Sequence, residues 1–224
     1  MKKACTERTC GECNRTSRSG FTLVEVLVVM GVLSIVGVLV LIIFSQSLKG
    51  TNKSQILISI KQNGQSVLES MTSVVRNADN IVCPAITPPA TSAPPSPNLV
   101  IVSKGIYTRY RFIPQIAGSN SNGLIQQDNP VKQMDPATGK EETDSVFVNR
   151  VCVLDNPMIN PIVLTDTNVQ NGVSLKSGSF IRERPAGFKE GVKINFSLGP
   201  AVQALPSVAG QIDDVVFETT IQLR

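Results

Sequence analysis

The sequence predicts an α+β protein in which a long N-terminal helix packs on an antiparallel β-sheet head. An apolar run extends over residues 21–44, and residues 45–81 repeat apolar side chains at helical spacing. After residue 98, short runs alternate apolar and polar residues. The two patterns indicate different elements, because side chains recur about every 3.6 residues on a helix face and every second residue on a strand face.

The apolar run at residues 21–44 is long enough to cross a membrane. As a helix it would be about 36 Å long, and the hydrocarbon core of a bilayer is about 30 Å thick. The run is longer than the apolar segment of a secretory signal peptide, so we expect it to remain as an anchor. The residues before it include Lys2, Lys3, Arg8, Arg15 and Arg18. Because positive flanks stay in the cytoplasm, we expect a single-pass protein with its N-terminus inside and its head outside.

Glu25 is the only charged residue of the apolar run. A carboxylate near the centre of a bilayer helix costs about 2.5–3.5 kcal/mol, so an acid here needs either a partner or a position close to water. Gly31, Ser34 and Gly37 form a patch of small residues that would let another helix approach closely. At about 100° per residue this patch lies roughly opposite Glu25, which favours a helix surrounded by other helices. The alternative is that Gly and Ser are simply common in membrane helices.

Residues 20–25 read Gly-Phe-Thr-Leu-Val-Glu, and they stand between a short basic leader and the apolar run. In this context they resemble the processing signal of type IV prepilins and pseudopilins, which implies a pilin-like fold. The resemblance implies that a prepilin peptidase cuts between Gly20 and Phe21 and methylates the new amino group of Phe21. It also implies that Glu25 pairs with the N-terminal amine of a neighbouring subunit during filament assembly. The alternative for Glu25 is an acid close enough to the membrane surface to stay hydrated.

The same resemblance implies a structural, non-enzymatic subunit of a type IV pilus-like or type II secretion pseudopilus filament. Its expected partners are the peptidase, other pilin or pseudopilin subunits and an assembly platform in the inner membrane. The closing FETTIQLR and the segment ending in VVRNADNI resemble minor pilins and J-type minor pseudopilins, which favours a minor subunit. We expect the chain in the inner membrane and then in a periplasmic or cell-surface filament. The alternative function is a membrane-anchored extracytoplasmic binding domain that does not polymerise.

Composition argues against other function classes. The chain has no His, which removes the usual general base and the commonest metal ligand, and no nucleophile motif supports a surface hydrolase. We therefore expect no enzymatic activity and no cofactor. Aromatic residues make up 4% of the chain, Trp is absent and the net charge of +4 is scattered. Nucleic acid is accordingly not an expected partner.

The cysteines fall into two groups. Cys5, Cys10 and Cys13 lie in the leader, where a zinc site would lack its fourth ligand, and we expect no role for them once residues 1–20 are removed. Cys83 and Cys152 would lie outside the cytoplasm, where disulfides persist. We expect a bridge between them, closing a loop of about 70 residues and contributing about 4 kcal/mol. Two unpaired buried thiols are the alternative.

Residues 45–81 are expected to form an amphipathic helix that packs against the head. Gly50 and Gly64 interrupt it as weak points, each costing up to about 1 kcal/mol relative to Ala, and either could mark a bend or a local melt. Prolines then make residues 82–98 an exposed, stiff connector. The predicted stripe comprises Leu57, Ile60, Leu68, Met71, Val75 and Ala78.

Residues 99–224 are expected to form the antiparallel head, with one face of the sheet covered by the helix. Two polar insertions, at about 118–145 and 199–214, are expected to interrupt it. Some pseudopilin heads bind calcium in comparable loops, but no EF-hand spacing is present, and solvated charge is our preferred interpretation. The predicted strands are NLVIVS, IYTRYRFI, SVFVNRVCVL, VKINFSL and VVFETTIQL. The acids of the first insertion are Asp128, Asp135, Glu141, Glu142 and Asp144.

Overall fold

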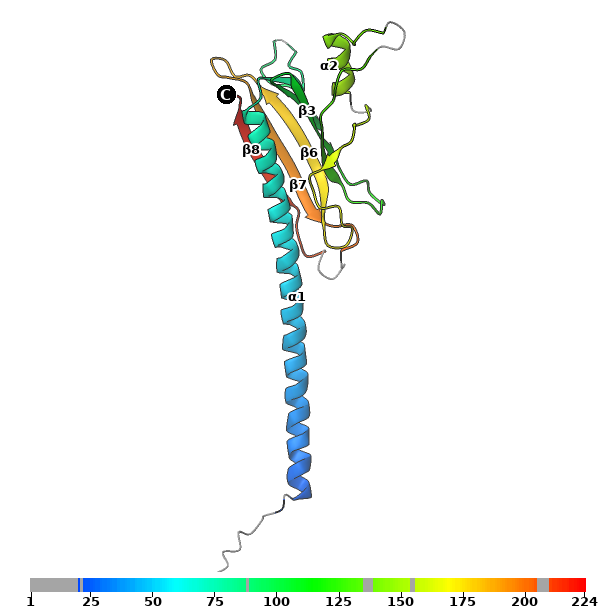
Figure 1. Ribbon diagram of the computed structural model, residues 1–224. Helices are drawn as coiled ribbons and strands as arrows, with labels where there is room; N and C mark the ends of the chain where they lie inside the picture. Colours follow the sequence, from blue (N-terminus) through cyan, green and yellow to red (C-terminus); the bar gives the residue numbers. More distant parts are fainter. Residues whose placement is uncertain (1–19, 21, 88, 135–138, 154–155, 205–209) are drawn as a thin grey trace, which may run out of the picture. The chain divides into compact units, whose positions relative to one another are not determined.

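The computed structural model describes residues 20, 22–87, 89–134, 139–153, 156–204 and 210–224 of the 224-residue chain. The chain divides into two compact units, residues 1–47 and 48–224. The predicted α+β class, with a long N-terminal helix and antiparallel sheets, is confirmed (Figure 1).

Helix α1 spans Leu23–Arg76 and contributes to both units. Up to Ser47, every residue of this helix is exposed. The described residues contain one helix that is long and apolar enough to cross a membrane, and it is α1. The first unit therefore has an apolar surface and no interior of its own.

From Leu48 onward, α1 belongs to the second unit and buries one stripe against the sheets. Met71 and Val75 are buried as predicted, whereas Leu57 and Leu68 are only half-buried. The helix ends at Arg76, earlier than the predicted residue 81, because the chain enters a strand at Asn80. The buried helix residues are Ile60, Gly64, Val67, Met71 and Val75.

The strands form two antiparallel sheets, one of five strands in the order β1-β2-β3-β4-β5 and one of three in the order β6-β7-β8. Four of the five predicted strand runs are found, in β2, β3, β7 and β8, and the larger set also includes strands that were not predicted. The bounds are β1 Asn80–Cys83, β2 Asn98–Ser103, β3 Ile106–Ile113, β4 Leu124–Asp128, β5 Ile162–Val163, β6 Val173–Glu183, β7 Gly191–Pro200 and β8 Val215–Gln222.

The predicted strand SVFVNRVCVL is wrong. Asp144–Cys152 forms helix α2, which buries Phe147 and Val151. These two side chains are four residues apart and share one helix face, and this contact overrides the β-branched composition that favoured a strand. Together with Val100 of β2 and Cys83 of β1, they form a second, smaller core.

The five-stranded sheet is consequently covered on both faces. Leu99 and Ile101 of β2 point into the main core with α1, while Val100 points into the smaller core under α2. This explains the unbroken apolar run NLVIVS, since a strand buried on both faces has no need for alternating polar residues. The expectation of one covered and one solvated face is correct for β8, where Ile221 is buried and Glu218 is exposed.

A series of phenylalanine contacts joins the two sheets to α1. Phe112 of β3 stacks on Phe180 of β6, with ring centroids 4.3 Å apart, and Phe196 of β7 stacks on Phe217 of β8 at 5.1 Å. Phe217 lies directly over Gly64, where an added Cβ would come within 2.1 Å of the ring. Gly64 is thus a close-packing residue within the helix, and the predicted bend or melt is not present there.

The proline-rich segment at residues 82–98 is fastened to the head rather than a free connector. The Ser96 N–H donates to the Phe180 carbonyl at 2.9 Å, and the Ala93 N–H donates to the Arg182 carbonyl at 2.8 Å. Ala93 is buried. Proline is compatible with this role, because an edge segment needs only some of its N–H groups for pairing.

The predicted insertion at 118–145 is also partly regular, because it contains β4 and the start of α2. In the second predicted insertion, β7 extends to Pro200, and residues 205–209 lie outside the described part of the chain.

Candidate functional site

The first turn of α1 positions Glu25. The Thr22 hydroxyl accepts a hydrogen bond from the Glu25 N–H at 3.2 Å, and the Thr22 carbonyl accepts one from the Val26 N–H at 3.2 Å. Thr22 is therefore the N-cap, and Glu25 is the third helical residue, the spacing of a capping box. A carboxylate in the first turn is favoured by the helix macrodipole, typically by about 0.3–1 kcal/mol. The Thr-x-x-Glu pattern of a capping box is visible in the sequence, although Thr22 was not among the predicted site residues.

The Glu25 side chain is exposed, and no ion pair or side-chain hydrogen bond involves its carboxylate among the described residues. Its surroundings are apolar: the Leu23, Val24 and Val26 side chains are all exposed. A carboxylate with no partner among the described residues, set in an apolar surface, can accept a cation from outside the chain.

The small-residue patch lies on the same exposed stretch. The Ser34 hydroxyl donates to the Met30 carbonyl at 2.8 Å, so its hydrogen bond is satisfied within the helix. A Cβ added at Gly31 or Gly37 would meet no other atom within 4 Å. The chain itself therefore gives no packing reason for either glycine, in contrast to Gly64.

Residues 15–41 match the family model described as the prokaryotic N-terminal methylation motif. This match agrees with the resemblance of residues 20–25 to the processing signal of type IV prepilins and pseudopilins. No curated protein and no solved structure matches the chain. The prepilin-type match includes Gly20, Thr22 and Glu25 as well as the small-residue patch. Gly20 is exposed and precedes the helix, whereas Phe21 and the leader cysteines Cys5, Cys10 and Cys13 lie outside the described residues.

Cys83 and Cys152 form a disulfide in the structure, with Cα atoms 5.8 Å apart and a sequence separation of 69. The bond joins β1 to the end of α2, because Cys152 lies on a helix and not on the strand predicted for SVFVNRVCVL. Asn98 of β2, fully buried, lies beside the same helix end and donates to the Cys152 carbonyl at 3.5 Å. The end of α2 is thereby held on the five-stranded sheet by a covalent bond and a hydrogen bond.

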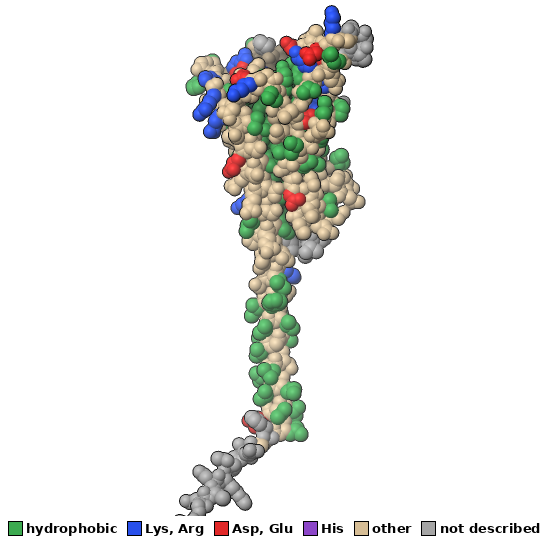
Figure 2. All heavy atoms as spheres, in the orientation of Figure 1, with side chains coloured by type: hydrophobic (Ala, Val, Ile, Leu, Met, Phe, Trp, Pro, Cys, Tyr) green, Lys and Arg blue, Asp and Glu red, His purple; other side chains and the backbone are tan. Residues whose placement is uncertain are grey.

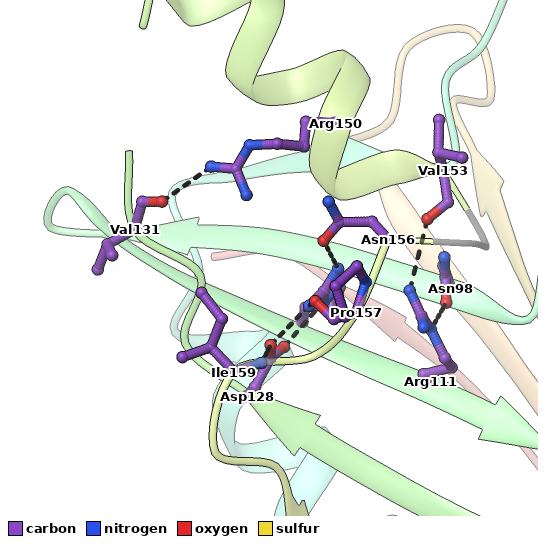
Figure 3. A network of polar contacts seen from close by, with 10 residues as sticks. Asn98, Arg111, Asp128, Val131, Arg150, Val153, Asn156, Pro157 and Ile159 are labelled. Atoms are coloured by element: carbon purple, nitrogen blue, oxygen red, sulfur yellow. Dashed lines mark hydrogen bonds and ion pairs between the residues drawn. The ribbon is translucent and has the colours of Figure 1, made fainter. Parts of the chain in front are cut away.

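A buried ion pair holds the loop that follows α2 (Figure 3). Arg109 of β3 donates from Nε and Nη2 to the two oxygens of Asp128 of β4, at 2.9 and 2.6 Å, and both side chains are fully buried. The remaining guanidinium donors reach Asn156 Oδ1 and the Pro157 carbonyl, at 3.0 and 3.1 Å. The Ile159 N–H donates to Asp128 at 2.9 Å. Every charged group of the pair is thus hydrogen-bonded, which a buried ion pair requires.

Arg109 was not among the predicted site residues, although the sequence contains a signal for it. In IYTRYRFI, Arg109 and Arg111 stand two residues apart and so share a face of the strand opposite to Tyr110 and Phe112. Arg111 donates to Asn98 Oδ1 at 2.9 Å, within the same interface under α2. Two arginines on one face of a strand, if that face is covered, predict buried carboxylate or carbonyl partners.

Three of the acids in the first polar insertion, where solvated charge was preferred over calcium binding, have cationic partners. Asp128 pairs with Arg109, Glu142 with Arg150 and Asp144 with Lys132. The hydrogen bond from Arg150 lowers the pKa of Glu142. Asp135 lies outside the described residues, and within them no group of three or more His, Cys, Asp or Glu side chains could hold a metal ion.

Proposed function

We propose that this chain is a structural, non-enzymatic subunit of a type IV pilus-like or type II secretion pseudopilus filament. The observation that carries the proposal is the methylation motif at the start of a helix whose apolar side chains are exposed throughout the first unit. Such a surface needs lipid before assembly and neighbouring helices afterwards. In this proposal the chain is first a single-pass protein of the inner membrane, with residues 1–20 inside and the head outside.

Processing would follow the motif. A prepilin peptidase would cut between Gly20 and Phe21 and methylate the Phe21 amine. Gly20 is exposed and lies outside α1, which supports access by a protease, because cleavage requires an extended and reachable backbone.

Assembly would use Glu25. After cleavage Glu25 becomes the fifth residue of the chain, on the first turn of α1. A carboxylate that has no partner among the described residues and the amine of a neighbouring subunit attract each other strongly in a low-dielectric surrounding. The N-cap at Thr22 supports this role, because it fixes where the helix starts and hence where the carboxylate stands.

We further propose the minor class of subunit. Its support is the resemblance of FETTIQLR, most of which lies in β8, and of VVRNADNI, which spans the end of α1 and the start of β1, to minor pilins and J-type minor pseudopilins. A minor subunit should be present in purified filaments in much smaller amounts than the major one, which quantitative mass spectrometry would measure.

The proposal is tested by the N-terminus of the protein in purified filaments. We expect intact-mass and peptide analysis to show a chain that starts at Phe21 and carries one added methyl group. The matched variants are Gly20→Asp, which should leave the leader uncut, and Ser19→Ala, which should be processed normally. If the filaments contain none of the chain, while the uncut form lies in the membrane, the alternative of a non-polymerising membrane-anchored domain is correct.

A further inference from the structure

The connection between β6 and β7 is a hairpin with a fixed base and an open tip. On one side of the base, the Arg184 N–H donates to the Thr91 carbonyl at 2.7 Å. On the other side, the Glu190 carbonyl accepts from the Leu223 N–H at 3.0 Å. Both ends of the connection are thus hydrogen-bonded to neighbouring segments, and the residues between them project from a rigid edge of the head.

The tip is an apolar turn, Pro185-Ala186-Gly187-Phe188. The Phe188 N–H donates to the Pro185 carbonyl at 3.1 Å, and Gly187 has a φ of +80°, which favours glycine. All four residues are exposed, and the exposed fraction of Phe188 is 68%. A rigid turn that holds an aromatic ring in water gives up the favourable burial of that ring, so the ring is available to an apolar partner.

Cations surround this tip. Arg184 and Lys189 flank it directly and are exposed. The β7–β8 register pairs Gly191 with Gln222, so Lys189 and Arg224 lie at the same end of that ladder. Arg224 also lines a groove of about 400 Å³ together with Arg76 at the end of α1. Figure 2 shows Lys and Arg side chains gathered at the end of the head where the β6–β7 connection and the C-terminus lie.

Within residues 184–190 one acid, Glu190, stands with two cations, Arg184 and Lys189. Glu190 is shared by Arg182 and Arg184, so two guanidiniums meet one carboxylate. Glu69 lines the same groove as Arg76 and Arg224, where cations again outnumber acids. Arg76, Lys189 and Arg224 have no ion-pair partner among the residues that the structure describes.

We propose that this hairpin end of the head binds the surface of an anionic phospholipid membrane. The tip of Pro185-Ala186-Gly187-Phe188 would enter the headgroup layer, while Arg184, Lys189 and Arg224 contact the lipid phosphates. A lipid surface is the partner that offers both parts of this pattern, because an apolar layer lies directly behind its anionic phosphates. A soluble polyanion would use the cations and leave the apolar tip in water.

The chain provides a clean probe of this contact, since it has no Trp. Phe188→Trp in the full chain places the sole indole at the tip, and holding the protein in an amphipathic polymer covers the apolar part of α1. Phosphatidylcholine vesicles with and without phosphatidylglycerol are then added. We expect a blue shift of the indole emission with the anionic vesicles and none with the neutral ones.

Variants measured by vesicle flotation separate the two parts of the contact. Phe188→Ala should weaken binding about tenfold through lost apolar burial. Lys189→Ala and Arg224→Ala should each weaken it about fivefold. The matched controls are Ile116→Ala, an apolar side chain 74% exposed elsewhere, and Lys61→Ala, an exposed cation on α1, and neither should change binding.

Three results would overturn the proposal. The indole emission could be the same with both kinds of vesicle. Phe188→Ala and the cation variants could bind like the controls while their circular dichroism shows an intact fold. A single-stranded oligonucleotide could bind as tightly as the anionic vesicles and be insensitive to Phe188→Ala, which would make this end a general polyanion surface.

Discussion

The two units of this chain keep their apolar side chains in opposite places. In residues 23–47 every residue is exposed, although most are apolar, whereas the unit from Leu48 onward buries a continuous core between α1 and two sheets. The head therefore carries the burial that stabilises it, while the first unit depends on a lipid or protein environment. A charged side chain on the first unit should therefore affect contacts between molecules. A charged side chain buried in the second unit should affect the stability of the fold.

One carboxylate in each unit illustrates the difference between the exposed first unit and the buried core of the second. Asp128 is fully buried and accepts hydrogen bonds from Arg109 and from the Ile159 N–H. Glu25 is exposed on the first turn of α1, and its carboxylate has no partner among the described residues. The first is satisfied by its own chain, and the second is open to a partner from another chain.

The largest stability effect is expected at Asp128. Asp128→Ala leaves the Arg109 guanidinium buried without its counterion, which should cost about 3–5 kcal/mol of unfolding free energy, measured by urea denaturation. The double variant Arg109→Met with Asp128→Leu should cost much less, because neither charge is then left alone. Glu25→Ala should not change the unfolding of the head, and an equal loss in both single variants would remove the contrast between the units.

The disulfide ranks next. Cys83→Ser with Cys152→Ser should destabilise the head by about 4 kcal/mol, as expected for a closed loop of this length in the chain-entropy model. The loss should be matched by adding a reductant to the unchanged protein. If labelling of the non-reduced mature protein finds two reactive thiols, the bond does not form and the substitution should have only a small effect.

A pH effect is expected from Tyr110, which lies in the main core with a hydroxyl that has no hydrogen-bond partner among the described atoms. Burial raises the pKa of Tyr110 from 10.0 to about 12. Because the pKa of Tyr110 is higher in the folded than in the unfolded chain, its contribution to the free energy of unfolding is full below about pH 10. That contribution is lost as the pH rises through about 12, and the loss is about 2–3 kcal/mol.

Tyr110→Phe isolates this contribution from the lysines that titrate in the same range. The variant should be at least as stable as the unchanged chain near neutral pH, because it removes an unpaired buried hydroxyl. The difference in unfolding free energy between the two proteins should then grow between about pH 9 and about pH 12. A constant difference over that range would show that Tyr110 keeps an ordinary pKa.

Replacing two glycines of α1 by Ala should give the smallest changes in stability, and the two changes should differ in sign. Gly64→Ala forces Phe217 to move, since the new Cβ would lie 2.1 Å from its ring, and should cost about 1–3 kcal/mol. Gly50→Ala meets no atom within 4 Å, so it should be neutral or stabilise the helix by up to about 1 kcal/mol. Thermal unfolding of the two variants gives the comparison, and equal shifts would contradict the packing assigned to Gly64.

Local patterns predicted the elements whose side-chain period stays unbroken. In β7, Val192, Ile194, Phe196 and Leu198 alternate with more polar residues, and all four are fully buried. The start of α1 was predicted equally well, because an apolar run preceded by basic residues needs no tertiary information.

Strand β6 could not be recognised in this way. Leu175 and Phe180 are both fully buried although an odd number of positions separates them, because a register shift between Leu175 and Ser177 reverses the alternation. Gly178 also lacks an apolar side chain because the Phe112 ring occupies its place, where a Cβ would lie 2.6 Å from the ring. Both features depend on the partner strand and are invisible in a single segment.

The candidate site also contains residues that one segment of sequence reveals and residues that only the fold brings together. Gly20, Phe21 and Glu25 could be selected from the sequence, since they form a short contiguous motif. Arg109 and Asp128 could be noticed only separately, because their pairing depends on two strands and a loop that meet only after folding.

We propose that Glu25 acts between subunits and not within its own fold. The most direct measurement compares Glu25→Ala with the neighbouring Val24→Ala in cells that form the filament, by quantifying the processed chain in membranes and in purified filaments. We predict normal cleavage, methylation and membrane insertion for both variants. Incorporation of Glu25→Ala should fall about tenfold or more, since truncating one partner of a desolvated charge pair costs about 2–5 kcal/mol, and Val24→Ala should assemble normally. Unchanged incorporation of Glu25→Ala would show that Glu25 has no role in filament assembly.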